Sequence, residues 1–350
     1  MRQVGTVYSI QLLRFVAAAL VVLFHSQQAF SLHVSRSVLP HEDYLFGFGA
    51  VGVHIFFVIS GFIMWVISDR RPMTPQGFLL DRIRRIAPSY WLVTSVMIAG
   101  AVVGLFPNLK LTGAHILSSL FFIPAQSPST GDIWPVLVQG WTLNFEMFFY
   151  VLFAGALFLP RRWRLSYLTV VFGGFFLIGL LFEPASPVLK TYTRPIILEF
   201  LGGVLLAELW IRRWIAGTSL GLACVGASLS GFATIFLIGA DFDEAICGPL
   251  AMALVYGMVS LEAGGSIGRV PLLTYLGDAS YSIYLWHTLA ISVIAKAAGV
   301  VGLSTTPTIA IAVAGGTILG AAAYELVEKP LRKIWSSDLL KQNAVERRPS

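Results

Sequence analysis

Charged side chains are scarce in this chain of 350 residues. Only 12% of the residues are charged, whereas 56% are hydrophobic. A soluble domain usually carries about 25% charged residues. Half that fraction leaves too few charges to cover a surface that faces water. The composition therefore excludes an ordinary soluble domain and indicates an integral membrane protein.

Cysteine is almost absent as well. Cys224 and Cys247 are the two cysteines, and their spacing matches no metal or redox motif. A disulfide framework is therefore excluded, and we expect both thiols in or near membrane helices as small apolar side chains. No metal site is expected. Internal repeats and low-complexity segments are also lacking.

Long apolar runs, in contrast, are abundant. About 20 apolar residues span a bilayer core, and Pro and Gly separate runs of this length along the chain. The predicted segments are 7–30, 46–67, 88–106, 136–159, 165–182, 195–211, 218–239, 245–262, 279–300 and 307–327. The sequence thus predicts an all-α, polytopic membrane bundle of about ten transmembrane helices.

The N-terminal segment, the longest loop and the C-terminal tail complete the predicted organisation. Residues 1–30 lack a small-residue cleavage site and are interpreted as a retained first helix rather than a signal peptide. The longest loop, 107–135, holds a weakly apolar stretch, 115–123, that is too short to span and is expected to be interfacial or re-entrant. We expect one transmembrane domain over 1–335 and a cytoplasmic tail over 336–350.

The positions of the basic residues predict the orientation. With a cytoplasmic N-terminus, 18 of the 24 Lys and Arg residues fall in inside segments and 4 in outside loops, while Arg14 and Lys296 lie within helices. Cytoplasmic loops carry such an excess of Lys and Arg. Both termini are therefore predicted to be cytoplasmic. Orientation also explains the net charge of +6, so no nucleic-acid partner is expected.

A few ionisable residues interrupt the apolar segments. Arg14 and His25 lie on the first segment, Glu146 on the fourth and His287 on the ninth. Each costs roughly 2.5–3.5 kcal/mol on insertion scales, which makes it a candidate functional residue. Arg14 and His25 share a helix face and lie about 16 Å apart along the axis. Hydrogen bonds that only join helices are the alternative.

Basic residues also cluster before the third segment. Arg82 and Arg85 are i, i+3 neighbours if this stretch is helical. Such a cluster at a cytoplasmic helix start suits phosphate groups, although simple membrane anchoring is the alternative. At the end of the last segment, Glu328 and Lys329 are expected at the interface, and Glu325 is expected to face a pocket.

Several of these features resemble one known family in their order along the chain. They are Arg14 with ten residues before His25, the run 56–62, the Arg82 and Arg85 pair before Pro88, and the stretches 141–146, 280–287 and 324–330. The set resembles acyltransferase family 3, membrane acyltransferases that modify bacterial surface glycans. The resemblance covers nearly the whole chain.

The resemblance implies a reaction and a location. An acyl group, commonly acetyl, would move from cytoplasmic acyl-CoA, with acetyl-CoA as the expected donor. The acceptor would be a sugar hydroxyl of a surface polysaccharide or its lipid-linked precursor, at the bacterial inner membrane. Some members carry an appended esterase-like domain. This chain is expected to work without one, as the stand-alone exopolysaccharide O-acetylases do, or with other polysaccharide-assembly proteins.

The resemblance also implies roles for single residues. The family's histidine corresponds to His25 and its arginine to Arg14, and its paired arginines correspond to Arg82 and Arg85. Our hypothesis is that the three arginines hold the phosphates of coenzyme A. His25 would act as a base or carry the acyl group, with Glu146 or His287 fixing its tautomer. The expected substrate contacts are Ser60, Trp141 and Tyr284.

Two other functions fit the same residues. A transporter or flippase for a glycan precursor also uses intramembrane Arg, His and Glu, but the inverted repeats and paired broken helices of many transporters are not visible. A sensor or assembly protein that has kept the fold but lost activity is the third interpretation. The intact pair of Arg14 and His25 argues against it.

Overall fold

The computed structural model describes residues 6–33, 42–215 and 217–334, and within these ranges every regular element is helical. Nine helices of the described chain are long and apolar enough to cross a membrane. They are α1 (Tyr8–His33), α2 (Glu42–Arg70), α3 (Pro75–Val102), α5 (Trp141–Leu157), α6 (Arg161–Leu181), α9 (Thr218–Ile238), α10 (Glu244–Ala263), α11 (Pro271–Val301) and α12 (Thr305–Ala323). The prediction of an all-α membrane bundle is confirmed.

Shorter elements complete the bundle. They are α4 (Gly113–Leu120), a 3-10 turn η1 (Val138–Gly140), α7 (Pro187–Tyr192), α8 (Ile197–Ile211) and a π-helical turn η2 (Tyr324–Glu328) that extends α12. The predicted span 195–211 corresponds to α8, whose 15 residues extend about 22 Å at 1.5 Å per residue. α8 therefore falls short of a bilayer core of about 30 Å.

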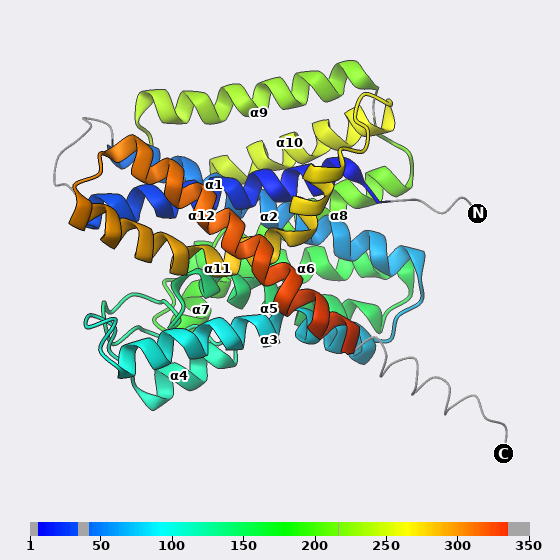
Figure 1. Ribbon diagram of the computed structural model, residues 1–350. Helices are drawn as coiled ribbons and strands as arrows, with labels where there is room; N and C mark the ends of the chain where they lie inside the picture. The colour runs from blue at the N-terminus through cyan, green and yellow to red at the C-terminus, as the bar shows by residue number, and fades with distance from the viewer. Residues whose placement is uncertain (1–5, 34–41, 216, 335–350) are drawn as a thin grey trace.

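Helix α1 lies inside the bundle and contacts α2, α10, α11 and α12, whereas α9 lies on the outside against α10 (Figure 1). The beginning of α1 and the end of η2 lie at the same end of the bundle, on the right in Figure 1. This placement agrees with two chain ends on one side of the membrane. The predicted tail 336–350 lies outside the described residues.

Helix α3 begins earlier than the predicted segment 88–106. Thr74 caps its N-terminus by accepting a hydrogen bond from the Gly77 backbone N–H, and Pro75 occupies the first turn, where a missing N–H costs nothing. Pro88 therefore lies inside the helix rather than at its start. Arg82 lies on the buried face of this helix, one turn away from both Phe78 and Ile86.

Glycines allow the central helices to approach closely. A Cβ atom on Gly61 would lie 2.0 Å from the Phe200 carbonyl oxygen, and one on Gly203 would lie 1.9 Å from the Val58 carbonyl oxygen. Only glycine permits α2 and α8 to meet backbone to backbone in this way. Gly61 and Gly203 thus form the packing surface between α2 and α8.

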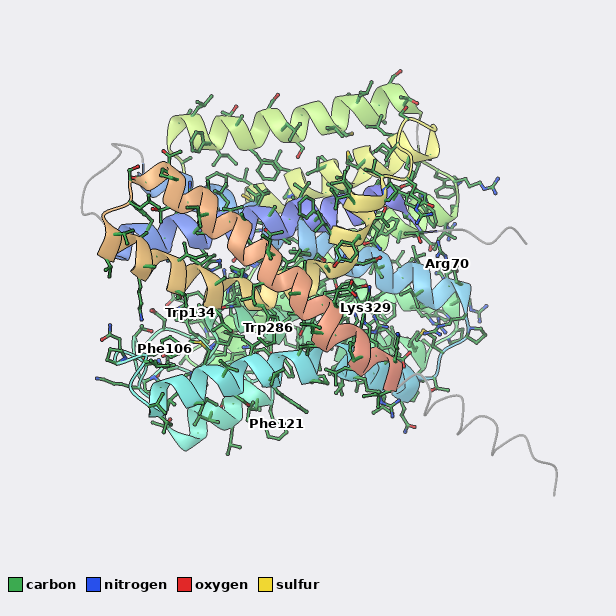
Figure 2. The ribbon with its side chains drawn as sticks, viewed as in Figure 1. Arg70, Phe106, Phe121, Trp134, Trp286 and Lys329 are labelled. Atoms are coloured by element: carbon green, nitrogen blue, oxygen red, sulfur yellow. The ribbon has the colours of Figure 1, made fainter. Side chains whose placement is uncertain are left out.

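Charged networks hold the end of the bundle where α2 ends and α6 begins. Glu208 accepts hydrogen bonds from Trp65 Nε1 at 2.7 Å, Arg161 at 2.6 Å and Arg212 at 2.7 Å. Arg70 lies at the same end, and Phe106 and Trp134 lie toward the opposite one (Figure 2). We call the end marked by Arg70, Arg161 and Arg212 the basic end.

Candidate functional site

One cavity gathers six of the nine predicted site residues. It lies between α1, α2, α3, α5 and α11 and contains about 760 Å³ of empty space, including its opening. Cavities of this size hold small-molecule ligands and cofactors. The predicted residues that line it are Arg14, Ser60, Arg82, Arg85, Glu146 and Tyr284. His25, Trp141 and His287 do not line it.

Arginines dominate the polar part of the cavity. Arg14 comes from α1, and one turn of α3 supplies Arg82 and Arg85. Arg14 and Arg82 are each 8% exposed, and both lie within electrostatic range of Arg85. Three like charges in a largely buried space repel one another, so the arrangement favours an anion.

The protein itself supplies few partners for these groups. Arg14 Nη1 donates a hydrogen bond to Gln11 Oε1 at 3.1 Å, and Arg82 Nη1 donates only to Met64 Sδ at 3.7 Å. Arg82 Nε is buried without a partner. Among the described residues, Arg85 makes no hydrogen bond or ion pair. Guanidinium groups left open in this way match the oxygens of phosphates.

Glu146 supplies an acidic group in the same cavity. Ser60 Oγ donates to it at 3.3 Å, and the Tyr150 hydroxyl donates to it in a short hydrogen bond. Its charge lies within electrostatic range of Arg82. Among the described residues Glu146 makes no hydrogen bond to an imidazole, and it lies near Arg82 rather than beside His25.

His25 and His287 form a pair. His287 Nε2 lies 3.1 Å from His25 Nδ1, so α1 and α11 bring together two residues 262 positions apart. The two ring centroids are 4.9 Å apart. Of the two groups expected to orient His25, the structure brings His287 into contact with it.

Hydrogen bonding assigns the protons of this pair. His287 Nδ1 lies 3.0 Å from the Ile283 carbonyl oxygen and therefore carries a proton, which leaves Nε2 as an acceptor. His25 Nδ1 faces two acceptors, the Val21 carbonyl oxygen at 3.0 Å and Nε2 of His287. The Nδ1 atom of His25 therefore carries a proton and is the hydrogen-bond donor. His25 Nε2 then holds the free lone pair, as a general base requires.

Tyr284 lines the cavity and lies near the histidine pair. Its ring lines the cavity, and its centroid is 6.2 Å from that of His287. Its hydroxyl donates to the Gln139 carbonyl oxygen at 2.8 Å and lies 2.7 Å from Thr142 Oγ1. These bonds hold the ring in the cavity wall near His287.

Trp141 lies outside this arrangement. Its ring packs edge-on against Trp134 and Phe57, with centroids 6.1 and 6.5 Å away, and the Arg194 guanidinium lies 5.6 Å from its centroid. The structure therefore places this residue in an aromatic cluster toward the end opposite the basic end, not in the cavity.

Sequence reasoning missed several polar groups of the site. Tyr150, Tyr281 and Thr142 line the cavity, and the Tyr281 hydroxyl donates to the Ile86 carbonyl oxygen at 2.7 Å. In the sequence these residues look like ordinary parts of apolar helices. The spacing of Glu146 and Tyr150, four residues apart on one helix face, was the one available indication.

A second buried pair lies away from the cavity. His54 Nδ1 lies 2.5 Å from Glu199 Oε1, and both side chains are buried. Within the described chain, no three His, Cys, Asp or Glu residues are placed to hold a metal ion. Cys224 and Cys247 are free.

Comparison with known proteins identifies relatives of this chain. The sequence is 56% identical to the exopolysaccharide production protein ExoZ of Rhizobium meliloti (strain 1021) over 286 residues, which cover 82% of this chain and 90% of the relative. It is 28% identical to nodulation protein 10 of Rhizobium leguminosarum bv. viciae over 93% of both chains. No solved structure matches the chain significantly.

A more distant relative is longer than this chain. The peptidoglycan O-acetyltransferase OatA of Listeria monocytogenes is 24% identical over 81% of this chain, and the match covers 51% of that protein. The family described as an acyltransferase domain, Acyl_transf_3, matches residues 7–326. The chain therefore belongs to acyltransferase family 3 and is a multi-pass membrane acyltransferase.

Proposed function

We propose that the chain transfers an acyl group, acetyl in the first instance, from cytoplasmic acyl-CoA to a sugar hydroxyl. The acceptor would be an exopolysaccharide or its lipid-linked precursor, at the inner membrane of a bacterium. The names of the relatives support this acceptor class, since they refer to exopolysaccharide production and to peptidoglycan O-acetylation. The cavity with three arginines and little counter-charge is the observation that carries the proposal.

The donor would bind from the basic end. Arg14, Arg82 and Arg85 would hold its phosphates, because open guanidinium groups form charge-assisted hydrogen bonds with phosphate oxygens. The acyl-bearing arm would then extend through the apolar part of the cavity toward Tyr284. Phe56, Phe57 and Ile59 line that part, and their surfaces suit an uncharged chain.

The transfer would take place at the histidine pair. His25 Nε2 takes the proton of the sugar hydroxyl, and the oxygen attacks the thioester carbonyl carbon. The carbon–sulfur bond breaks, and the CoA thiolate leaves with the proton returned from Nε2. Throughout the reaction His287 Nε2 accepts a hydrogen bond from His25 Nδ1–H. This bond orients the His25 ring so that the lone pair on its Nε2 faces the sugar hydroxyl. In the alternative route, Nε2 attacks first and carries the acyl group to the sugar.

Acyl transfer by membranes that contain a His25→Ala variant tests the catalytic role. Labelled acetyl-CoA and the host polysaccharide would be incubated with wild-type and variant membranes, and labelled product and free CoA measured. We expect a loss of about 10²–10⁴-fold, the usual contribution of a general base. Gln27→Ala, in the same helical turn, is the matched control. Full polysaccharide acetylation by the His25→Ala variant would refute the assignment.

Binding of acyl-CoA tests the donor site separately. A variant with both Arg82→Gln and Arg85→Gln should lose affinity for acetyl-CoA, because two charge-assisted contacts are removed. An Arg213→Gln variant, altered in an exposed residue after α8, is the control. Unchanged affinity in the double variant would refute the phosphate role. A flippase, unlike the proposed enzyme, would release no CoA in the presence of acceptor.

A further inference from the structure

A fourth arginine, Arg332, lies beside the arginines of the cavity. It comes from the helical residues after η2, far from α3 in sequence. Arg332 lies within electrostatic range of both Arg14 and Arg85. No motif considered in the sequence included this residue, and it does not line the cavity itself.

The π-helical turn η2 explains why Arg332 reaches this position. Pro330 cannot donate a hydrogen bond to the Leu326 carbonyl, and its ring would collide with that carbonyl in a regular α-helix. The chain widens just before it, and the Lys329 N–H bonds to the Tyr324 carbonyl oxygen five residues back. Such π turns are rare and occur frequently at functional sites.

At this turn the buried acidic residue is Glu328, not Glu325. Glu328 is 1% exposed, whereas Glu325 is exposed and pairs with Lys329 at 2.6 Å. This reverses the expectation that Glu325 faces a pocket and Glu328 the interface. Ser282 Oγ on α11 donates to Glu328 Oε2 at 2.5 Å and holds the carboxylate in place.

Glu328 and Arg332 are close but incompletely bonded. Arg332 Nη2 lies 2.6 Å from Glu328 Oε1, yet neither atom has a partner in hydrogen-bonding geometry, and both atoms are buried. The charges attract, but the directional bonding capacity of both atoms is unused. A buried donor in this state is available to another acceptor.

We propose that Arg332 is a further phosphate-binding residue of the donor site and that Glu328 is its counter-ion when the donor is absent. This inference rests on the proposed use of acyl-CoA. In the free protein Glu328 offsets the repulsion among Arg14, Arg85 and Arg332. When CoA binds, its phosphates provide that negative charge, and Arg332 bonds a phosphate oxygen. Glu328 then opposes binding, since it leaves a second negative charge nearby.

Affinities of the purified protein for CoA and for pantetheine, which lacks the phosphates, test this proposal. Arg332→Gln should weaken CoA binding about tenfold, the loss of one charge-assisted hydrogen bond, and leave pantetheine binding unchanged. Lys329→Gln removes one positive charge from the same helical segment, at the position marked in Figure 2, and should change neither affinity. Arg332→Lys keeps the charge without the planar fork and should fall between wild type and Arg332→Gln.

Glu328→Gln provides the opposite test. It keeps the shape of the side chain and an acceptor for Ser282 but removes the negative charge, so CoA should bind more tightly than to the wild type. Weaker CoA binding in both Glu328→Gln and Arg332→Gln would mean that the pair only stabilises the fold and would overturn the proposal. Equal effects of Arg332→Gln on CoA and pantetheine would also overturn it.

The same binding measurements distinguish a wrong donor from a wrong role for Arg332. If the wild-type protein binds CoA no better than pantetheine, the proposed donor itself is wrong. If the wild type prefers CoA and Arg332→Gln behaves as Lys329→Gln does, only the role of Arg332 is wrong.

Discussion

At the scale of single residues, the arginines of this chain fall into two groups. Arg161 and Arg212 of the basic end are paired: Arg161 contacts Asp69 at 3.1 Å and Glu208 at 2.6 Å, and Arg212 contacts Glu208 at 2.7 Å. Those of the cavity, Arg82 and Arg85 above all, lack carboxylate partners among the described residues. Membrane anchoring accounts for the first group. It does not account for a buried guanidinium group without a partner. Burial of an unpaired charge destabilises the folded protein unless a bound ligand supplies the opposite charge.

His287 should affect turnover more than donor binding. In a His287→Ala variant, His25 Nδ1 keeps only the Val21 carbonyl as acceptor and its ring is less well fixed. We expect kcat for acyl transfer to fall about tenfold or more, because a base must stay within hydrogen-bond reach of its proton, while KM for acetyl-CoA stays the same. Steady-state kinetics measure both values. A variant with unchanged kcat would show that His25 is oriented without its partner.

The residue roles that could be predicted are those with charges in apolar segments. Arg14, His25 and His287 are conspicuous because lipid excludes such groups. Tyr150 and Thr142 could not be predicted, since aromatic and hydroxyl side chains are common in membrane helices for packing alone. The pairing of His25 with His287 depends on the packing of α1 on α11, which no local pattern reveals.

At the scale of helices, backbone contact between α2 and α8 sets the position of the cavity wall. Gly203→Ala would place a methyl group 1.9 Å from the Val58 carbonyl oxygen and force the helices apart. We expect a loss of stability of about 1–3 kcal/mol, as for other overpacked interiors, visible as a lower Tm of the purified protein in detergent. Gly174→Ala on α6 has nothing within 4 Å of the new Cβ and should leave Tm equal or higher.

A smaller clash on α12 should affect the histidine pair. A Cβ on Gly316 would lie 3.1 Å from His287 Cβ and 3.2 Å from Val22 Cγ1. His287 must shift by a few tenths of an ångström, which lengthens its contact with His25. Gly316→Ala should therefore lower kcat while CoA affinity is kept, because Arg14, Arg82 and Arg85 lie on α1 and α3 and Arg332 follows about four helical turns after Gly316. A loss of CoA affinity with normal turnover would contradict this view of the site.

The helices themselves follow from apolar length and from capping residues such as Thr74. Their internal irregularities do not. The π turn before Pro330 is not visible in the apolar pattern, and Glu328 is buried there whereas Glu325 is exposed. Likewise the apolar composition of 195–211 predicts a full span, whereas α8 has 15 residues and ends before Arg212.

At the scale of the whole molecule, the charge distribution predicts which residues face the cytoplasm. In a variant without Cys224 and Cys247, single cysteines at positions 110 and 213 would lie at opposite ends of the bundle. A membrane-impermeant maleimide added to intact cells should label Lys110→Cys, and Arg213→Cys only after the cells are opened. The reverse pattern would place the arginine cavity on the outside, away from cytoplasmic acyl-CoA.

The position of Tyr284 has a consequence for the membrane itself. A protein that receives its donor at one face and serves an acceptor toward the other contains the beginnings of a channel. Tyr284, held by hydrogen bonds to Thr142 and Gln139, lies in the cavity wall near His287. If the proposed route runs from the arginines to the histidine pair, this ring narrows it, and a narrow path limits the leak of protons across the bilayer while the donor site is empty.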